Sequence, residues 1–321
     1  QGSAKFMFSP IPIIFTRAKT STPDSLYKCK EYFQQALEVD QNYSLAWYGL
    51  SWFYYNMGFL GYLVPGTAMT EAKQAALKAL GLDEMLPEAR AMLARFRACE
   101  YDWDGAEHEF RRTLELAPNS VMARHDYATY TLMQTRRLDM AIDEVKKAAE
   151  SDPLSTFLQT TLGTLYYFCR QWEPAVEYLQ RALEFDPNFN TAYQFLGFTY
   201  LEVDKPDEGI AACEKAARIL GQGQWALTIP GVAYAKAGKI DEAHRFLKEL
   251  QALAEKAHVS PSAFAWIYCS LGEIEKCLEW FEKAIDQHDW LNIICYLLPI
   301  YDPLRSHPRY KALLRKMNLE P

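Results

Sequence analysis

The side chains that could carry acid–base or metal chemistry are scattered along this sequence. None of the histidines belongs to an H-E-x-x-H motif or another metal-ligand spacing, and the chain holds no glycine-rich phosphate loop and no G-x-S-x-G turn. A lone histidine such as His125 is more often a hydrogen-bonding residue than a base. We therefore expect no enzyme, no cofactor and no metal. The histidines are His108, His125, His244, His258, His288 and His307.

The carboxylates and thiols also have structural interpretations. Asp102 and Asp104 alternate with aromatic residues in the turn EYDWDGAE, where helix capping is their expected role. The cysteines form no C-x-x-C pair, and most stand at apolar helical positions, where a free thiol behaves as a small hydrophobe. This pattern is typical of a reducing compartment and predicts a cytoplasmic protein. The cysteines are Cys29, Cys99, Cys169, Cys213, Cys269, Cys277 and Cys295.

The net charge and the composition of the N-terminal residues disfavour nucleic acid and membranes as partners. The chain has 34 basic and 41 acidic residues, a net charge of −7, which disfavours nucleic acid because phosphate binding needs clustered Lys and Arg. The apolar run from Phe6 to Phe15 is too short to span a bilayer and lacks the features of a signal peptide. We expect no membrane partner, and we interpret residues 1–20 as an irregular segment left where an N-terminal neighbour has been cut away.

A repeated pattern organises most of the chain. The stretch TFLQTTLGTLYYFCRQWEPAVEYLQRALEFDP, residues 156–187, contains Leu162-Gly163, Tyr166, Ala175, Leu179 and Ala182. The same positions recur in three further steps of 34 residues, for example as Leu196-Gly197, Pro230-Gly231 and Phe264-Ala265. A fixed period of this length indicates stacked supersecondary units.

Each unit reads as two helices joined by a short turn. Ala175, Leu179 and Ala182 are spaced four and three, so they share one helix face. A glycine such as Gly163 costs helix propensity, which is best explained by two backbones that cross too closely for a side chain. The Asp186-Pro187 pair is expected to end the second helix.

This period and pattern resemble the tetratricopeptide repeat, and the resemblance covers residues 25–290. It implies an all-α, right-handed superhelical solenoid of antiparallel helix pairs, with about seven units, an N-terminal helix and C-terminal capping helices. We expect residues 21–321 to form a single solenoid with units starting near 44, 87, 121, 156, 190, 224 and 258, and a cap at 291–321.

Several local departures carry their own expectations. Residues 24–40 read as one helix, and Gly58–Thr70 as a long apolar loop that either folds over its helix pair or docks a partner. The turn of the third unit has one extra residue. Pro230 is expected to kink its helix or to delay its start. A helix is expected from Leu291 to Ile300, and a short basic capping helix from Arg309 to Met317.

A narrower resemblance rests on EYDWDGAEHEFRRTLELAPN, the long first turn and the ending YDPLRSHPRYKALLRKMNL. These phrases are similar to repeat arrays at the C-terminus of bacterial multidomain signalling proteins with kinase, adenylate-cyclase-like, TolB-like or winged-helix N-terminal domains. The resemblance implies an intracellular bacterial signalling context. None of those N-terminal domains is visible in this sequence, so their activities are not carried over.

In a tetratricopeptide superhelix the first helix of each unit lines the concave surface. First-helix residues that point away from the packing positions are therefore the candidate partner-binding residues. This lining is aromatic and carries few charges, which suits an apolar peptide or an amphipathic helix. The set is Tyr48, Trp52, Tyr55, Arg95, His125, Thr129, Leu132, Thr160, Thr164, Tyr167, Phe168, Gln194, Phe198, Leu201, Trp225 and Trp266.

Two interpretations of the aromatic positions stay open at this point. Trp52, Tyr55, Tyr167 and Phe198 either contact a bound peptide or fill the core between repeats. We accordingly predict a non-enzymatic protein-interaction scaffold that binds a protein or peptide in its concave groove. The alternative is a structural module that self-associates, giving a homodimer through its apolar caps or the Gly58–Thr70 loop.

Overall fold

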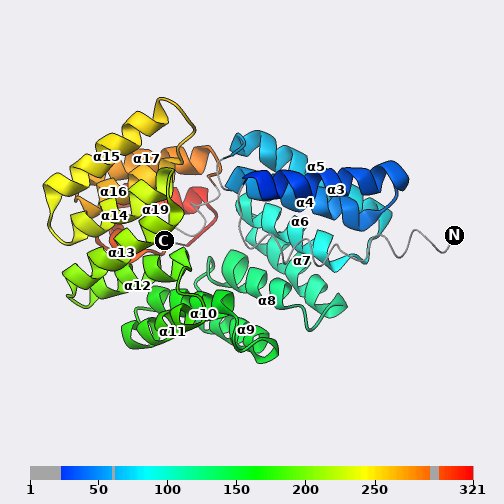
Figure 1. The fold of residues 1–321 in the computed structure, drawn as a ribbon, viewed down its shortest axis with the longest axis horizontal. Helices are drawn as coiled ribbons and strands as arrows, with labels where there is room; N and C mark the ends of the chain where they lie inside the picture. Colours follow the sequence, from blue (N-terminus) through cyan, green and yellow to red (C-terminus); the bar gives the residue numbers. More distant parts are fainter. Residues whose placement is uncertain (1–22, 60–61, 290–295, 321) are drawn as a thin grey trace. The chain divides into compact units, whose positions relative to one another are not determined.

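The computed structural model describes residues 23–59, 62–289 and 296–320, and every regular element in these ranges is helical (Figure 1). The chain divides into two compact units, each described here by itself. Unit 1 comprises residues up to 96 together with 108–117, and unit 2 comprises 97–107 together with 118–321. The predicted all-α fold of paired helices is confirmed in both.

Unit 1 is built from α3 (Pro23–Val39), α4 (Ser44–Phe59) and α5 (Pro65–Leu82), with most of α6 (Pro87–Cys99) and the second half of α7 (Trp103–Leu116). α4 packs on both α3 and α5. Phe33 of α3 is 1% exposed, and its ring lies against Gly49 of α4, where an added Cβ would collide with it. The helix predicted over 24–40 is therefore confirmed, and it pairs with α4.

Unit 2 repeats the helix pair along the chain. Its pairs are α8 with α9, α10 with α11, α12 with α13, α14 with α15 and α16 with α17 (Figure 1). The bounds are α8 (Val121–Tyr127), continued by the π-helix η1 (Ala128–Leu132), α9 (Leu138–Ser151), α10 (Thr156–Phe168), α11 (Trp172–Phe185), α12 (Asn190–Glu202), α13 (Pro206–Leu220), α14 (Gln224–Lys236), α15 (Ile240–Ala254), α16 (Pro261–Ser270), α17 (Ile274–Asp286), the 3₁₀ helix η2 (Pro299–Leu304) and α19 (Pro308–Lys316).

The repeated small and branched residues form the core of unit 2. Ala175, Leu179 and Ala182 of α11 are each 0% exposed, as the shared helix face predicted. Gly163 of α10 lies against α11, where an added Cβ would come 2.5 Å from Leu179 Cγ and 3.2 Å from the Ala175 carbonyl oxygen. The close crossing predicted at this glycine is confirmed.

The extra residue of the third helix-pair repeat, which starts near residue 121, lies inside the first helix of that repeat. Met133 donates its backbone N–H to the Ala128 carbonyl at 2.8 Å, the five-residue step of a π-helix. The inserted residue is thus absorbed between Ala128 and Leu132, and the expectation that the turn after the helix holds it was wrong.

Three other local expectations have different outcomes. α5 begins at Pro65, so the second half of the predicted Gly58–Thr70 loop is helical. Proline is favourable at the first position of a helix, because the backbone N–H that it lacks would have no partner there. α14 starts at Gln224 and continues through Pro230, so that helix does not start late. Residues 291–295 of the predicted Leu291–Ile300 helix lie outside the described residues, and 296–300 form a turn and the start of η2.

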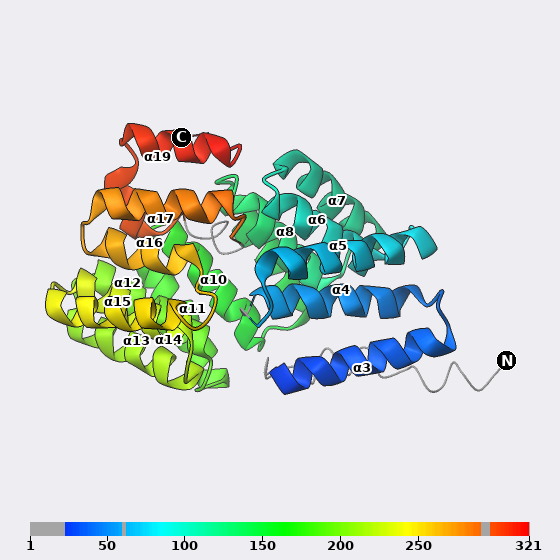
Figure 2. The same ribbon diagram turned by 90° about the horizontal axis from the view of Figure 1, so that it is seen from above.

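The helix cap predicted at Asp102 and the predicted C-terminal helix are both present in the structure. Asp102 accepts the backbone N–H of Gly105 at 3.0 Å and precedes α7, so it caps that helix. The Arg97 guanidinium beside it holds the pKa of the Asp102 carboxyl below its usual range. The basic C-terminal helix predicted over 309–317 is α19, which packs on α17 (Figure 2).

In six consecutive helix-pair repeats, the first helix is followed by a residue in the left-handed backbone conformation. Tyr101, Arg136, Arg170, Asp204, Gly238 and Gly272 have φ between 58° and 75°, and they recur every 34 or 35 residues. Only glycine adopts this conformation without strain, and other L-residues lose about 1–2 kcal/mol in it. The three large side chains at these positions therefore need compensating contacts.

A matched pair of glycine substitutions tests that compensation. Asp204→Gly should leave the free energy of unfolding unchanged or raise it by up to about 1 kcal/mol, because it relieves a φ of 58° at an exposed position. Arg170→Gly relieves a similar φ but removes charged hydrogen bonds to Asp302, so it should lower the free energy of unfolding by about 2 kcal/mol. Urea denaturation of both variants gives the comparison, and equal stabilities would contradict the compensation.

Candidate protein-interaction surface

The first helices of unit 2 form one layer. α10 contacts α12, α12 contacts α14, and α14 contacts α16. A chain of aromatic rings runs across them: Tyr167 to Phe198 at 6.5 Å between centroids, Phe198 to Trp266 at 6.5 Å, and Trp266 to Trp225 at 5.5 Å. The structure thus brings together aromatic residues that the sequence placed in one lining.

Most of these rings are buried. Tyr167 is 1% exposed, Phe198 2% and Trp266 4%, and burial raises the pKa of the Tyr167 hydroxyl well above its usual value. In this structure these rings fill the space between helices, which is the core interpretation left open by the sequence. The other buried members of the predicted lining are Tyr55, Leu132, Thr160 and Phe168.

The partly exposed members of the lining in unit 2 are more polar. The His125 ring is tilted against the Phe157 ring at 4.3 Å between centroids, and its Nδ1 lies 3.1 Å from Asp126 Oδ1. Phe157 is 39% exposed, so this edge of the layer is open to solvent. The remaining partly exposed members are Thr129, Thr164, Gln194, Leu201 and Trp225.

One position of the first helix holds a polar residue in five successive helix-pair repeats. The residues are His125, Thr160, Gln194, Thr228 and Ser262, spaced by 35 and then by 34. Thr160, Thr228 and Ser262 are buried. We call this set the polar column. Sequence reasoning named its first three members and missed Thr228 and Ser262, although the same spacing predicts them.

Some polar atoms of this layer have no hydrogen-bond partner in the described chain. They are Thr160 Oγ1, Ser262 Oγ and Trp266 Nε1. A buried polar group left unpaired costs about 1–3 kcal/mol. Such groups are unusual in a core.

In unit 1 the four predicted residues lie on α4 and α6. The Arg95 guanidinium stands over the Tyr55 ring at 5.3 Å, and the Tyr55 ring lies 6.2 Å from that of Phe96. Trp52 packs against the cluster that contains Phe53, and Tyr48 packs against Leu86 and its neighbours. Trp52, Tyr48 and Arg95 are partly exposed.

The C-terminal segment of unit 2, residues 296–305, contacts the side chains of Arg136 and Arg170, two of the residues with positive φ. Arg170 donates to Asp302 Oδ1 at 2.7 Å, to Asp302 Oδ2 at 3.2 Å and to the Leu297 carbonyl at 3.1 Å. The Arg136 guanidinium stands 5.8 Å from the Tyr296 ring centre, and burial raises the pKa of Tyr296 to about 12. These contacts compensate the strained backbone at Arg136 and Arg170.

The first residue of α7 and the turn before that helix contact Met317 and Asn318. Trp103 Nε1 donates to the Met317 carbonyl at 2.7 Å, and Asn318 donates to the Tyr101 carbonyl at 3.0 Å. The Tyr101 ring lies 5.4 Å from that of His288. Tyr101, Arg136 and Arg170 therefore share both their backbone conformation and their role, because each contacts the last part of unit 2.

A pocket of about 290 Å³ opens beside the C-terminal segment. Arg136, Arg170 and Arg305 line it together with one acidic residue, Asp302. Its apolar wall is formed by Leu138, Phe168 and Leu297. Of these residues the sequence had singled out Phe168 alone. The recurrence of arginine at 136 and 170 was a usable signal, but the approach of residues 297–305 follows only from the tertiary fold.

Within the described ranges, no three His, Cys, Asp or Glu side chains are arranged to hold a metal ion. The described helices include none that is long and apolar enough to cross a membrane. Cys29, Cys99, Cys169, Cys213, Cys269 and Cys277 are free thiols, and burial raises the pKa of Cys213.

Comparison with known proteins places this arrangement among helical repeats. The model of the PPR repeat family matches residues 232–253 and 262–287. Anaphase-promoting complex subunit 3 of Schizosaccharomyces pombe is 23% identical over 190 residues, which is 59% of this chain and 27% of that protein. The chain thus spans about a quarter of the length of this curated relative.

Solved structures show the same fold. The APC/C hetero-tetramer Cut9–Hcn1 matches with a TM-score of 0.59 and 15% identity, over 77% of this chain and 46% of the matched chain. PilW, a type IV pilus biogenesis factor, matches with a TM-score of 0.51 and 18% identity, over 70% of this chain and 98% of that one. At these identities the likeness concerns the fold alone.

Proposed function

We propose that this tetratricopeptide-like repeat protein is a non-enzymatic scaffold that binds a peptide or a helix along the first helices of unit 2. A role as a protein-interaction scaffold in general is supported by the repeat-family match and by the fold of its neighbours. The binding surface and the nature of the ligand are our own inference from the side chains of the layer.

The polar column carries this proposal. Polar residues recur at one first-helix position through five units, beside a continuous run of aromatic rings. Thr160, Thr228 and Ser262 are buried, so His125 and Gln194 are the members of the column that a ligand can reach. A bound peptide presents backbone donors and acceptors at regular intervals, so it can hydrogen-bond to these two side chains.

The partly exposed residues mark where such a ligand enters. His125, Phe157, Thr164 and Gln194 lie on α8, α10 and α12, and each presents some surface to solvent. Tyr167 and Phe198 form the buried floor beneath the layer. The ligand therefore contacts the polar edge first, and the rings keep that edge rigid.

We further propose that the protein works within a bacterial signalling protein in the cytoplasm. This part rests on the resemblance of EYDWDGAEHEFRRTLELAPN and YDPLRSHPRYKALLRKMNL to arrays in such proteins. Self-association into a homodimer stays a prediction from the sequence.

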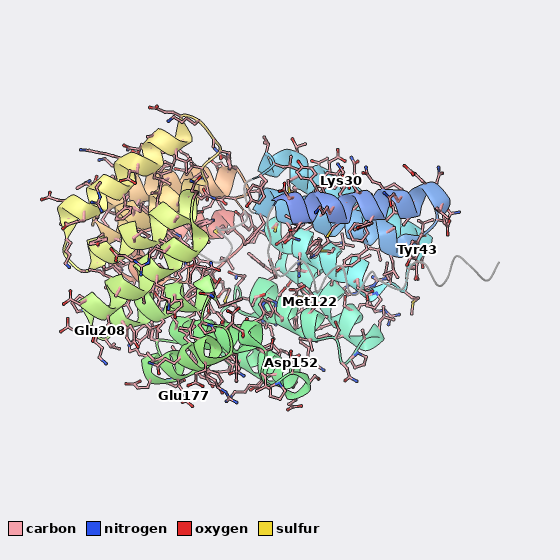
Figure 3. The ribbon with its side chains drawn as sticks, viewed as in Figure 1. Lys30, Tyr43, Met122, Asp152, Glu177 and Glu208 are labelled. Atoms are coloured by element: carbon pink, nitrogen blue, oxygen red, sulfur yellow. The ribbon has the colours of Figure 1, made fainter. Side chains whose placement is uncertain are left out.

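Two double variants, each of which introduces two arginines, test the surface. Thr164→Arg/Gln194→Arg places two long cations on the layer and should reduce partner capture from a bacterial lysate at least about tenfold. Glu177→Arg/Glu208→Arg places the same side chains on exposed positions of α11 and α13, at the edge of the molecule in Figure 3, and should leave capture unchanged. Capture is quantified by mass spectrometry after both variants pass a circular dichroism check.

Equal capture by the two variants would overturn the proposed surface. Loss of capture in the Glu177→Arg/Glu208→Arg variant alone would move the binding site to the second helices.

A further inference from the structure

The pocket beside the C-terminal segment carries an excess of positive charge within an acidic protein. Three guanidinium groups, from Arg136, Arg170 and Arg305, line it with the single carboxylate of Asp302. The whole chain has a net charge of −7, so the pocket runs against the charge of the molecule. A concave site lined by one sign of charge concentrates ligands of the opposite sign.

The three arginines are engaged to different degrees. Arg170 donates to Asp302 and to the carbonyls of Phe168 and Leu297, so its guanidinium is largely occupied. Arg305 contacts only one oxygen of Asp302, through Nε at 2.8 Å and Nη2 at 2.7 Å. Arg136 faces the Tyr296 ring and has no carboxylate partner among the described residues.

Two of the six described non-glycine residues with positive φ line this pocket. Arg136 and Arg170 both have positive φ, near 60°, where glycine would be the unstrained choice. Strained residues gather at binding and catalytic sites more than elsewhere. The Arg170 side chain is held by its bonds to Asp302, whereas the exposed Arg136 side chain lies over the Tyr296 ring.

The chain itself shows which chemistry this pocket accepts. Asp302 lies between Tyr301 and Pro303-Leu304, so it is a carboxylate carried by an apolar segment. Planar guanidinium groups bind carboxylates with parallel hydrogen bonds, as Arg170 does here. The wall of Leu138, Phe168 and Leu297 suits apolar residues next to such a carboxylate.

We propose that this arginine pocket, defined by Arg136, Arg170, Asp302 and Arg305, binds an acidic side chain flanked by apolar residues in the partner peptide. The inference rests on the proposed function and specifies the chemistry of its ligand. Arg136 and Arg305 supply the donors for the incoming carboxylate, and Arg170 remains with Asp302. Phe168 joins the pocket to the aromatic layer, since its ring lies 6.0 Å from that of Phe195 on α12.

The test uses two capped, fluorescent peptides, Leu-Phe-Asp-Leu and Leu-Phe-Asn-Leu, which differ in one charge. Fluorescence anisotropy with the full chain at low salt should show the aspartate peptide binding about tenfold more tightly than the asparagine peptide. The preference should disappear in Arg136→Gln/Arg305→Gln. The preference should persist in Arg218→Gln/Arg245→Gln, which removes two other arginines of unit 2 that are exposed and lie outside the pocket.

Asp302→Asn supplies a readout that a purely structural role for the arginines would not produce. Removing the resident carboxylate frees Arg305 and part of Arg170, so the aspartate peptide should bind several-fold more tightly than to the wild type. Circular dichroism confirms that each variant is folded.

Equal binding of the two peptides to the wild type, or no binding of either, would overturn the arginine pocket as an acidic-peptide site. A preference that survives Arg136→Gln/Arg305→Gln would do the same. These results leave the lysate capture by the first-helix layer as a separate measurement, so failure of the pocket and failure of the proposed surface are distinguishable.

Discussion

Gly197→Leu is expected to lower the free energy of unfolding by about 3 kcal/mol, because the added side chain has no room between α12 and α13. A Cβ at this position would lie 2.5 Å from Cys213 Sγ, 2.8 Å from the Gly209 carbonyl oxygen and 3.0 Å from the Cys213 backbone nitrogen. Two of these three atoms belong to backbone, which cannot rotate away. The helices must therefore separate.

The comparison variant for Gly197→Leu is Glu208→Leu, which adds the same side chain to an exposed position of α13. Its effect on the free energy of unfolding should stay within about 0.5 kcal/mol. Both variants are followed by urea denaturation with circular dichroism. A Gly197→Leu midpoint equal to that of the wild type would show that the two helices do not cross closely at this repeat position.

Phe281→Ala is the second substitution with a large expected effect. The Phe281 side chain is 0% exposed, and its ring lies 5.3 Å from that of Tyr301 and 5.6 Å from that of Tyr310. Truncation of a buried phenylalanine lowers the free energy of unfolding by about 3–5 kcal/mol through lost burial and the cavity left behind. The loss falls where α17 packs on α19 (Figure 2) and where Phe281 contacts Tyr301 of η2.

This location predicts a regional signature. Hydrogen exchange in residues 308–316 should accelerate much more than in residues 156–168 of α10, because the capping helix loses the buried contact between Phe281 and Tyr310. Trp280→Ala removes a larger side chain from the same helix, but that ring stacks on Phe264 at 4.3 Å. It should leave the exchange of residues 308–316 close to that of the wild type. Uniform acceleration in both variants would contradict the assigned role of Phe281.

The repeating part of the fold was accessible from sequence because one set of contacts recurs. Gly163 lies against Leu179 and Ala175, and Gly197 lies against the equivalent Cys213 and Gly209, so the residue types at these positions reveal the packing. Local deviations were harder to place. The extra residue of the third unit was visible as a spacing of 35, but periodicity alone did not locate it in the π-helix Ala128–Leu132.

The candidate surface was only partly predictable for a related reason. A first-helix position that points away from its own partner helix can face a neighbouring repeat or solvent, and residue type does not decide which. Tyr167 and Phe198 were assigned to a lining and are buried between repeats, whereas Thr164 and Gln194 keep some exposure. The arginine pocket joins Arg136 and Arg170, which recur 34 residues apart, to Arg305, whose approach is long-range and carries no periodic signal.

The central claim is that a partner lies along the first helices of unit 2, and site-specific crosslinking tests it most directly. A photoreactive phenylalanine analogue at Gln194 is compared with the same analogue at Glu177, on the exposed face of α11. In lysate, we predict crosslinked peptides from the same partner segment at position 194 and none above background at position 177. Crosslinks at 177 with none at 194 would contradict the account.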